Sequence, residues 1–299
     1  MTKPAIEARD LAKVFPGNVP AVNGFDLAVP PGAVYGLIGR NGAGKTTAIR
    51  LMMGLLRPNR GESALLGKNM LAAPAQHRAR VTFVPQSPRL PQGLTLSEYA
   101  DEICRYFPRW DTEGFRDISA RFEVNPQKRF HQMSGGEQRK AAVALALAPR
   151  PEALLLDEPA AGLDPIARRE LLSVLVEALG ESEGLTVLLS THIVGDLERV
   201  ADHIGIMDRG RIVLSAPLDE LREKYCRVQI VFDETDVPPD LKVPGVLREQ
   251  RSGPVLEAVV RLEHPDQLNS IRALPRTRFR EFPLGLEDLF LELQKEGQS

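Results

Sequence analysis

The stretch GRNGAGKTT at positions 39–47 leaves few folds open to this chain. An apolar run at residues 34–38 precedes it and predicts a buried strand. Apolar side chains at helical spacing follow it at residues 48–53. A strand, a glycine-rich loop and a helix in this order are the context that the pattern G-x-x-x-x-G-K-[ST] requires. The sequence therefore predicts a phosphate-binding loop between a strand and a helix.

The residue types in this loop suit phosphate chemistry. Glycines allow turns that a Cβ would block, so several backbone N–H groups can face one point, which lies at the positive end of the following helix. Lys45 supplies a charge for the β- and γ-phosphates, and the Thr46 hydroxyl can ligate Mg²⁺. The expected nucleotide contacts of the loop are Gly39, Arg40, Asn41, Gly42, Ala43, Gly44, Lys45, Thr46 and Thr47. The alternative is an ordinary glycine-rich turn, but the four fixed positions would coincide by chance in roughly one chain of this length in a hundred.

Composition narrows the class of protein further. A chain of 299 residues is long enough for two domains, and 43% apolar with 26% charged residues is typical of a soluble globular protein. The net charge of −2 gives no reason to expect nucleic acid as a partner. Two cysteines, without metal or disulfide spacing, favour a reducing cytoplasm. The N-terminus lacks the apolar core of a secretion signal, and no apolar run approaches the roughly twenty residues that a membrane span needs.

Further polar residues follow other predicted strands. The strand at residues 154–156 ends in two adjacent carboxylates, of which Asp157 is placed for Mg²⁺ and Glu158 for orienting or deprotonating a water. The strand at 187–190 leads to His192, which can reach a γ-phosphate if it lies at the same end of the same sheet. A strand at 81–84 ends just before Gln86. The sequence thus predicts several functional groups at one sheet edge.

A second glycine loop and a helical region lie between these strands. Residues 134–138, SGGEQ, precede an alanine-rich helical stretch at 139–148, which makes a second potential anion site. Thr95 and Glu98 form a capping box that opens a helix, and a second helix is expected from Asp111 or Thr112 to about Phe122. The aromatic cluster between these helices is either core or a docking surface, and the sequence leaves both open. It consists of Tyr106, Phe107 and Trp110.

Taken in order, these motifs resemble the nucleotide-binding subunits of ABC transporters over about residues 5–220. The resemblance identifies GRNGAGKT at 39–46 as Walker A, Gln86 as the glutamine loop, MSGGEQ at 133–138 as the signature, LLLDE at 154–158 as Walker B with its adjacent glutamate, 161–164 as the D-loop and His192 as the switch histidine. Met133 stands where leucine is common, and Ala160 where threonine or serine is common. Neither departure removes a catalytic group.

The resemblance implies an α/β fold for residues 1–220: a P-loop NTPase sheet with an antiparallel β subdomain, predicted from alternating runs at 6–29, and a helical subdomain at about 87–150. It implies ATP and Mg²⁺ as cofactors and two ATP molecules at a head-to-tail homodimer interface. Lys45, Gln86, Glu158 and His192 would be catalytic, and Thr46, Gln86 and Asp157 would hold the metal. Further nucleotide contacts would come from Phe15, stacked on the base, and from Ser134, Gly135, Gly136, Glu137 and Asp164.

Shorter strings at 107–111, 141–148 and 285–290 resemble the bacterial exporter-type, ABC-2-like subunits, in which a separate chain forms the permease. This implies a peripheral ATPase at the cytoplasmic face of the membrane, which contacts the membrane only through the permease and drives export. Two alternatives are an ATPase that drives a non-transport membrane complex and, with less support, a DNA-repair or translation ATPase. Repair members split the cassette with long coiled coils, and no heptad run separates Lys45 from Asp157.

The chain beyond residue 225 differs in composition from the rest. A helix at 218–224 leads to expected strands at 227–232 and 255–262 and to expected helices at 266–273 and 286–294, with turns dominating the proline-rich stretch 237–254. This predicts a small accessory α+β domain at residues 225–299. It holds no recognisable chemistry, and a scaffold for dimer or partner contacts is favoured over a ligand sensor.

Overall fold

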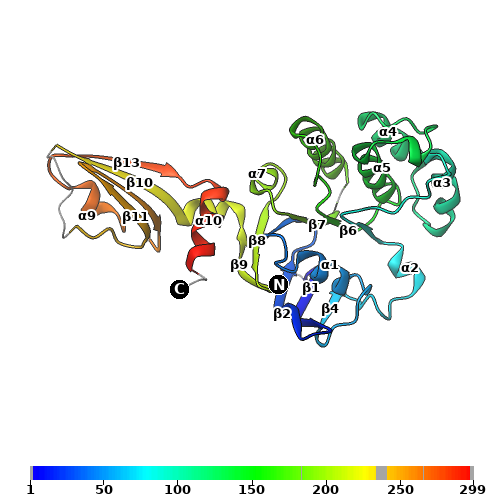
Figure 1. Cartoon of the computed structure of the whole chain (residues 1–299), viewed down its shortest axis with the longest axis horizontal. Coiled ribbons are helices and arrows are strands. Elements are labelled where there is room, and N and C mark those ends of the chain that lie inside the picture. Colours follow the sequence, from blue (N-terminus) through cyan, green and yellow to red (C-terminus); the bar gives the residue numbers. More distant parts are fainter. Residues whose placement is uncertain (1–2, 183, 234–240, 265, 297–299) are drawn as a thin grey trace. The chain divides into compact units, whose positions relative to one another are not determined.

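The computed structural model describes residues 3–182, 184–233, 241–264 and 266–296. It divides into two compact units, Met1–Ser215 and Ala216–Ser299 (Figure 1). Within the described residues, no helix combines the length and the apolar character needed to cross a membrane. Both cysteines, Cys104 and Cys226, are free.

The first unit begins with a three-stranded antiparallel sheet. Its strands are β1 (Ile6–Phe15), β2 (Val19–Val29) and β4 (Arg60–Leu65), in the order β2-β1-β4. The antiparallel element predicted for residues 6–29 is therefore confirmed. Alternate residues of β2, including Phe25, Leu27 and Val29, are buried on one face, as the alternating pattern requires.

A six-stranded sheet forms the centre of the same unit, in the order β5-β6-β7-β3-β8-β9. Its strands are β3 (Val34–Ile38), β5 (Val81–Val84), β6 (Ala153–Asp157), β7 (Thr186–Thr191), β8 (His203–Asp208) and β9 (Arg211–Pro217). The strands from β5 to β8 pair in parallel. Ile38 lies opposite Thr191, and Asp157 lies opposite Ser190. This register brings the ends of β3, β6 and β7 to one edge, where ligands of such sheets bind.

Helix α1 (Lys45–Met52) lies between the two sheets (Figure 1). Its apolar residues Ala48, Ile49, Leu51 and Met52 belong to one buried cluster with residues of both sheets. Because burial of this face fixes the helix, its first turn, which carries Lys45 and Thr46, is fixed relative to the sheet edge.

The helical elements behave largely as the sequence predicts. Helix α3 (Leu96–Ile103) begins with the Thr95 capping box, α4 (Thr112–Arg121) is capped by Asp111, and α5 (Gly135–Leu147) by Ser134. Helix α5 thus begins within the SGGEQ stretch, four residues before the predicted start, because the Ser134 cap already satisfies its first turn. The remaining helices of the unit are α2 (Ala75–Arg78), η1 (Cys104–Tyr106), η2 (Phe130–Gln132), α6 (Pro165–Glu181) and α7 (Val194–Leu197).

The aromatic residues near α3, which the sequence left open as either core or docking surface, differ in their burial. The ring of Trp110 packs against Phe107 and Phe115, with centroids 6.3 and 5.8 Å apart. Tyr106 is 67% exposed, and the Arg105 guanidinium lies 5.6 Å from its ring centroid. Phe107 also lines an apolar groove described below.

The second unit is a four-stranded antiparallel sheet in the order β11-β12-β10-β13, with three helices. These elements are α8 (Leu218–Lys224), β10 (Tyr225–Phe232), β11 (Val246–Ser252), β12 (Val255–Arg261), α9 (Asn269–Arg272), β13 (Thr277–Pro283) and α10 (Leu286–Glu296). Its core is a separate cluster that includes Val228, Ile230, Leu256 and Val260.

Two strands of this unit differ from the sequence-based expectation. The stretch 237–254 was expected to consist of turns; its residues 237–240 lie outside the described part, and β11 occupies 246–252. Strand β13 was not predicted at all. Both are edge strands that carry exposed arginines and glutamates and bury few side chains, so neither shows the apolar alternation by which strands are recognised.

Candidate functional site

The P-loop, residues 39–47, opens into a cavity of about 460 Å³ at the carboxyl edge of the six-stranded sheet. Most of the residues that the sequence assigned to nucleotide binding meet here. The lining residues are Ala21, Arg40, Asn41, Gly42, Gly44, Lys45, Thr46, Thr47, Gln86 and Glu158. Gly39 and Ala43 belong to the same loop, and Ala43 N donates to the Arg40 carbonyl.

The loop shape depends on glycine at position 44. Gly44 has a φ of +107°, and a Cβ there would lie 2.2 Å from the Ala21 carbonyl oxygen. A side chain at this position would therefore require a backbone shift in β2. Ala21 was absent from the sequence-based list, because a backbone carbonyl from another strand leaves no signal in the sequence.

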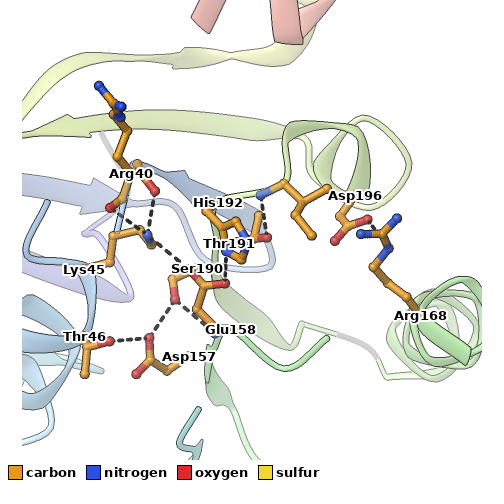
Figure 2. Close-up of polar contacts among 12 residues, drawn as sticks. Arg40, Lys45, Thr46, Asp157, Glu158, Arg168, Ser190, Thr191, His192 and Asp196 are labelled. Atoms are coloured by element: carbon orange, nitrogen blue, oxygen red, sulfur yellow. Dashed lines mark hydrogen bonds and ion pairs between the residues drawn. The ribbon is translucent and has the colours of Figure 1, made fainter. Parts of the chain in front are cut away.

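Lys45 is buried, and its ammonium forms hydrogen bonds and an ion pair. Its side chain is 5% exposed, and its ammonium donates to the carbonyl oxygens of Gly39 and Arg40 at 2.6 and 3.3 Å. The same ammonium lies 3.1 Å from Glu158 Oε1, as Figure 2 shows. A buried ammonium needs such partners, since an unpaired charge is costly in this setting.

Glu158 joins the P-loop to His192. Its Oε2 lies 2.6 Å from His192 Nδ1 (Figure 2), and its carboxylate is 5% exposed. The Glu158 backbone has a φ of +51°, in the left-handed region that is unusual for glutamate, and its N–H donates to the Ser190 carbonyl at 3.0 Å. The turn thereby aims the carboxylate at the Lys45 ammonium and the His192 imidazole.

Asp157 is the deepest group of the site. It is fully buried, and its Oδ1 accepts hydrogen bonds from Thr46 Oγ1 at 3.0 Å and Ser190 Oγ at 2.9 Å. Its other oxygen, Oδ2, is buried without a hydrogen-bond partner among the described residues. Sequence reasoning missed Ser190, because its position opposite Asp157 depends on the register of two strands that are distant in the sequence.

The remaining predicted residues do not line the P-loop cavity. Phe15 ends β1, is 36% exposed, and has Lys13 Nζ 5.8 Å from its ring centroid. Asp164 caps α6, and its pKa is lowered by the hydrogen bonds that it accepts from the Ala167 and Ile166 N–H groups. The signature residues Ser134, Gly135, Gly136 and Glu137 form the start of α5.

The signature loop is rigidly built. Ser134 Oγ accepts from the Glu137 N–H at 3.1 Å, while Glu137 Oε2 accepts from the Ser134 N–H at 2.7 Å. Lys128 binds the Glu137 carboxylate, and with the Ser134 N–H it lowers the pKa of Glu137. The Ser134 hydroxyl still has its own proton to donate, so this helix start offers donors to an anion.

The chain is similar to known proteins along most of its length. A family model described as ABC transporter matches residues 22–161. The chain is 34% identical over 296 residues to the Nod factor export ATP-binding protein I of Cupriavidus metallidurans, covering 96% of each chain. It is 27% identical over 286 residues to the ABC transporter ATP-binding protein YtrB of Bacillus subtilis, covering 96% of this chain and 97% of that one.

A solved structure agrees with the fold. It is described as the ATP binding subunit of an ABC transporter, and it matches with a TM-score of 0.64 and 28% identity over 73% of this chain and 92% of its own. The predicted α/β ABC ATPase fold is thereby confirmed. The chain belongs to the ABC transporter family, and it is an ATPase that serves as the ATP-binding subunit of an ABC transporter.

Proposed function

We propose that this chain hydrolyses Mg-ATP at a head-to-tail homodimer interface and drives export through a separate permease. Residues 1–220 would form the ATPase domain, with the helical subdomain at about 87–150, and residues 225–299 the accessory domain. The observation that carries the proposal is the cluster of Lys45, Glu158 and His192 at the mouth of the P-loop cavity. It supplies a cation for the γ-phosphate, a carboxylate for the attacking water, and an imidazole beside it.

The oxygen ligands around Asp157 fit Mg²⁺. Three groups offer the oxygen ligands that Mg²⁺ prefers: the buried Asp157 Oδ2, the Thr46 hydroxyl and the Gln86 side chain at the cavity wall. Mg²⁺ in nucleotide sites takes one or two carboxylates and leaves other positions to phosphates and water. No cluster of three or more His, Cys, Asp or Glu side chains suited to a metal occurs in the described part of the chain. When bound, Mg²⁺ would neutralise charge on the β- and γ-phosphates.

Replacing Asp157 with asparagine is expected to lower turnover at limiting Mg²⁺ far more than at saturating Mg²⁺, because the amide is a weaker ligand than the carboxylate. Turnover measured across a Mg²⁺ titration would test this, with EDTA as the zero point. Asp117→Asn, an exposed aspartate on α4, is the matched control. A parallel loss at every Mg²⁺ concentration would contradict a role for Asp157 in metal binding.

The position of the signature loop supports the proposed dimer. Among the described residues that line the P-loop cavity, none comes from the start of α5. The donors at Ser134 and Gly136 therefore need an anion from elsewhere, and a second copy of the chain, rotated head to tail, would bring its bound γ-phosphate to them. Every motif is present in this chain, so a homodimer would hold two complete sites.

Mixing two inactive variants tests this arrangement. Lys45→Ala disables its own P-loop, and Ser134→Arg places a bulky cation where the partner's γ-phosphate would lie. A mixed dimer carries both lesions at one site and none at the other, so mixing should restore up to about a quarter of wild-type turnover. Each variant mixed with itself is the control. Sites completed within one chain would give no recovery.

Two coupled sites could also give no recovery, so a cross-link provides the second measurement. Asn41→Cys and Gly135→Cys should form an ATP-dependent link between subunits in a background of Cys104→Ser and Cys226→Ala. A Cβ at Gly135 meets no atom within 4 Å, so the new cysteine fits without strain. Failure to cross-link with ATP and the permease present would count against the head-to-tail dimer.

The proposed permease contact is an apolar groove of about 310 Å³ whose lining includes Pro85, the residue before Gln86. It lies where edge strand β5 meets α3 and α5, and its walls include Phe83, Tyr99, Ile103, Phe107 and Leu145. An exposed apolar groove of this kind suits a partner segment, and its position next to Gln86 would couple docking to the metal site. Export is supported by the Nod factor export relative. If the permease alone attaches this chain to the cytoplasmic face of the membrane, the chain should sediment with membranes only when the permease is co-expressed. Sedimentation of the chain with membranes that lack the permease would contradict this attachment.

A further inference from the structure

An ion pair behind the cluster of Lys45, Glu158 and His192 connects two helices of the first unit (Figure 2). Arg168 Nε lies 3.4 Å from Asp196 Oδ1. Arg168 is in the first turns of α6, which Asp164 caps, and Asp196 is in α7, which begins two residues after His192. The pair therefore joins the helix that follows the 161–164 loop to the helix that follows the histidine.

Asp196 is the sheltered member of the pair. Its side chain is 9% exposed and that of Arg168 is 27% exposed. Burial raises the pKa of Asp196, and the Arg168 guanidinium is the foremost of the charges that oppose this rise. Within the described part of the chain, Asp196 forms no second ion pair. Exposed ion pairs contribute little, whereas a carboxylate with so little exposure gains more from a charged partner.

The two helices differ in length, and both bury apolar side chains, which in α7 are Val194 and Leu197. Helix α6 is 17 residues long and buries Leu171, Leu172 and Leu175. Helix α7 has only four residues, and its start is held by the hydrogen bond from Ile193 N–H to Thr191 Oγ1 at 3.0 Å. A single turn has little stability of its own. The ion pair to α6 therefore restrains α7, and with it the segment that carries His192.

We propose that Arg168 and Asp196 are positioning residues whose ion pair sets the place of His192 relative to the 161–164 loop. The inference rests on the proposed role of His192 at the γ-phosphate. Because Asp164 is the cap of α6, a shift of its loop on contact with a second chain would move Arg168 and, through Asp196, the His192 segment. The pair would thus make hydrolysis sensitive to dimer contact without touching nucleotide.

The test compares kcat and KM for ATP in four variants. Arg168→Met and Asp196→Asn should each lower kcat by about tenfold and leave KM within about twofold, because His192 is displaced while the P-loop is untouched. Arg168→Lys keeps the charge and should retain most of the turnover. The double variant Arg168→Met/Asp196→Asn should be no slower than the slower single variant, since both remove one interaction. Arg169→Met, the exposed neighbour on the same helix, is the matched control and should be unaffected.

Two further measurements separate the possible failures. Unfolding temperatures show whether a variant loses activity by losing its fold; Asp196→Asn removes the charge and keeps the shape, so it should stay folded. His192→Ala tests the underlying role. Normal turnover in His192→Ala would refute the proposed function itself. If His192→Ala loses turnover strongly, the proposed function stands. The positioning inference alone would then be overturned if Arg168→Met and Asp196→Asn multiplied each other's effects in the double variant, or if they acted mainly on KM.

Discussion

Replacing Glu158 with glutamine is expected to reduce ATP turnover by at least about a hundredfold while ATP binding is kept. Glutamine has nearly the same shape, but it cannot take a proton from water or orient it as a carboxylate does. It also removes the negative charge that faces Lys45 at 3.1 Å. The variant should therefore bind ATP at least as well as the wild type and hold it in a stable dimer.

Turnover and size-exclusion chromatography with Mg-ATP measure the two effects separately. The Glu158→Gln variant should elute as a dimer with ATP and as a monomer without it. Glu113→Gln, which alters an exposed glutamate in the first turn of α4, is the control and should behave as the wild type. Wild-type turnover in Glu158→Gln would rule out the role assigned to this carboxylate.

Replacing Lys45 with alanine is expected to weaken ATP binding at least tenfold, on the order of 1.4 kcal/mol or more. The ammonium would be a direct charge partner for the phosphates, and it also donates hydrogen bonds to the Gly39 and Arg40 carbonyls. A fluorescent ATP analogue measures the affinity. An unchanged dissociation constant would show that the P-loop does not use this lysine for nucleotide.

The same substitution should lower the unfolding temperature, because it leaves the buried Glu158 carboxylate without its ammonium partner. Adding Glu158→Gln to Lys45→Ala removes the unpaired charge. The double variant should regain stability but not affinity, which separates the contribution of Lys45 to the fold from its contribution to binding. A double variant as unstable as Lys45→Ala would mean that the destabilisation has another origin.

The central elements of the nucleotide unit could be predicted because their signals are local. Strand β3, the glycine loop and α1 follow one another in the chain, and Thr95, Asp111 and Ser134 cap the helices that begin next to them. The roles of Gln86, Ser134 and His192 stay predictions. Ser134→Arg and His192→Ala test two of them.

The partners that the sequence did not predict are distant in the chain. Ser190 reaches Asp157 through the register of two parallel strands, Ala21 meets Gly44 through its backbone, and Arg168 reaches Asp196 between two helices. Each contact depends on tertiary packing, which leaves no periodic pattern. Strands β11 and β13 were not predicted for a related reason, since edge strands carry the charged residues that usually indicate loops.

The contact between Lys45 and Glu158 also bears on the order of events at the site. One ammonium serves both the carboxylate and an incoming phosphate, and the more highly charged phosphate group competes the better for it. Glu158 would then give up its contact with the ammonium and keep His192, whose Nδ1 lies 2.6 Å from its Oε2. The carboxylate oxygen that faced Lys45 would then be open to accept a hydrogen bond from a water, so the site would orient an attacking water only after nucleotide has arrived. The site would therefore not position a water for attack before ATP is bound.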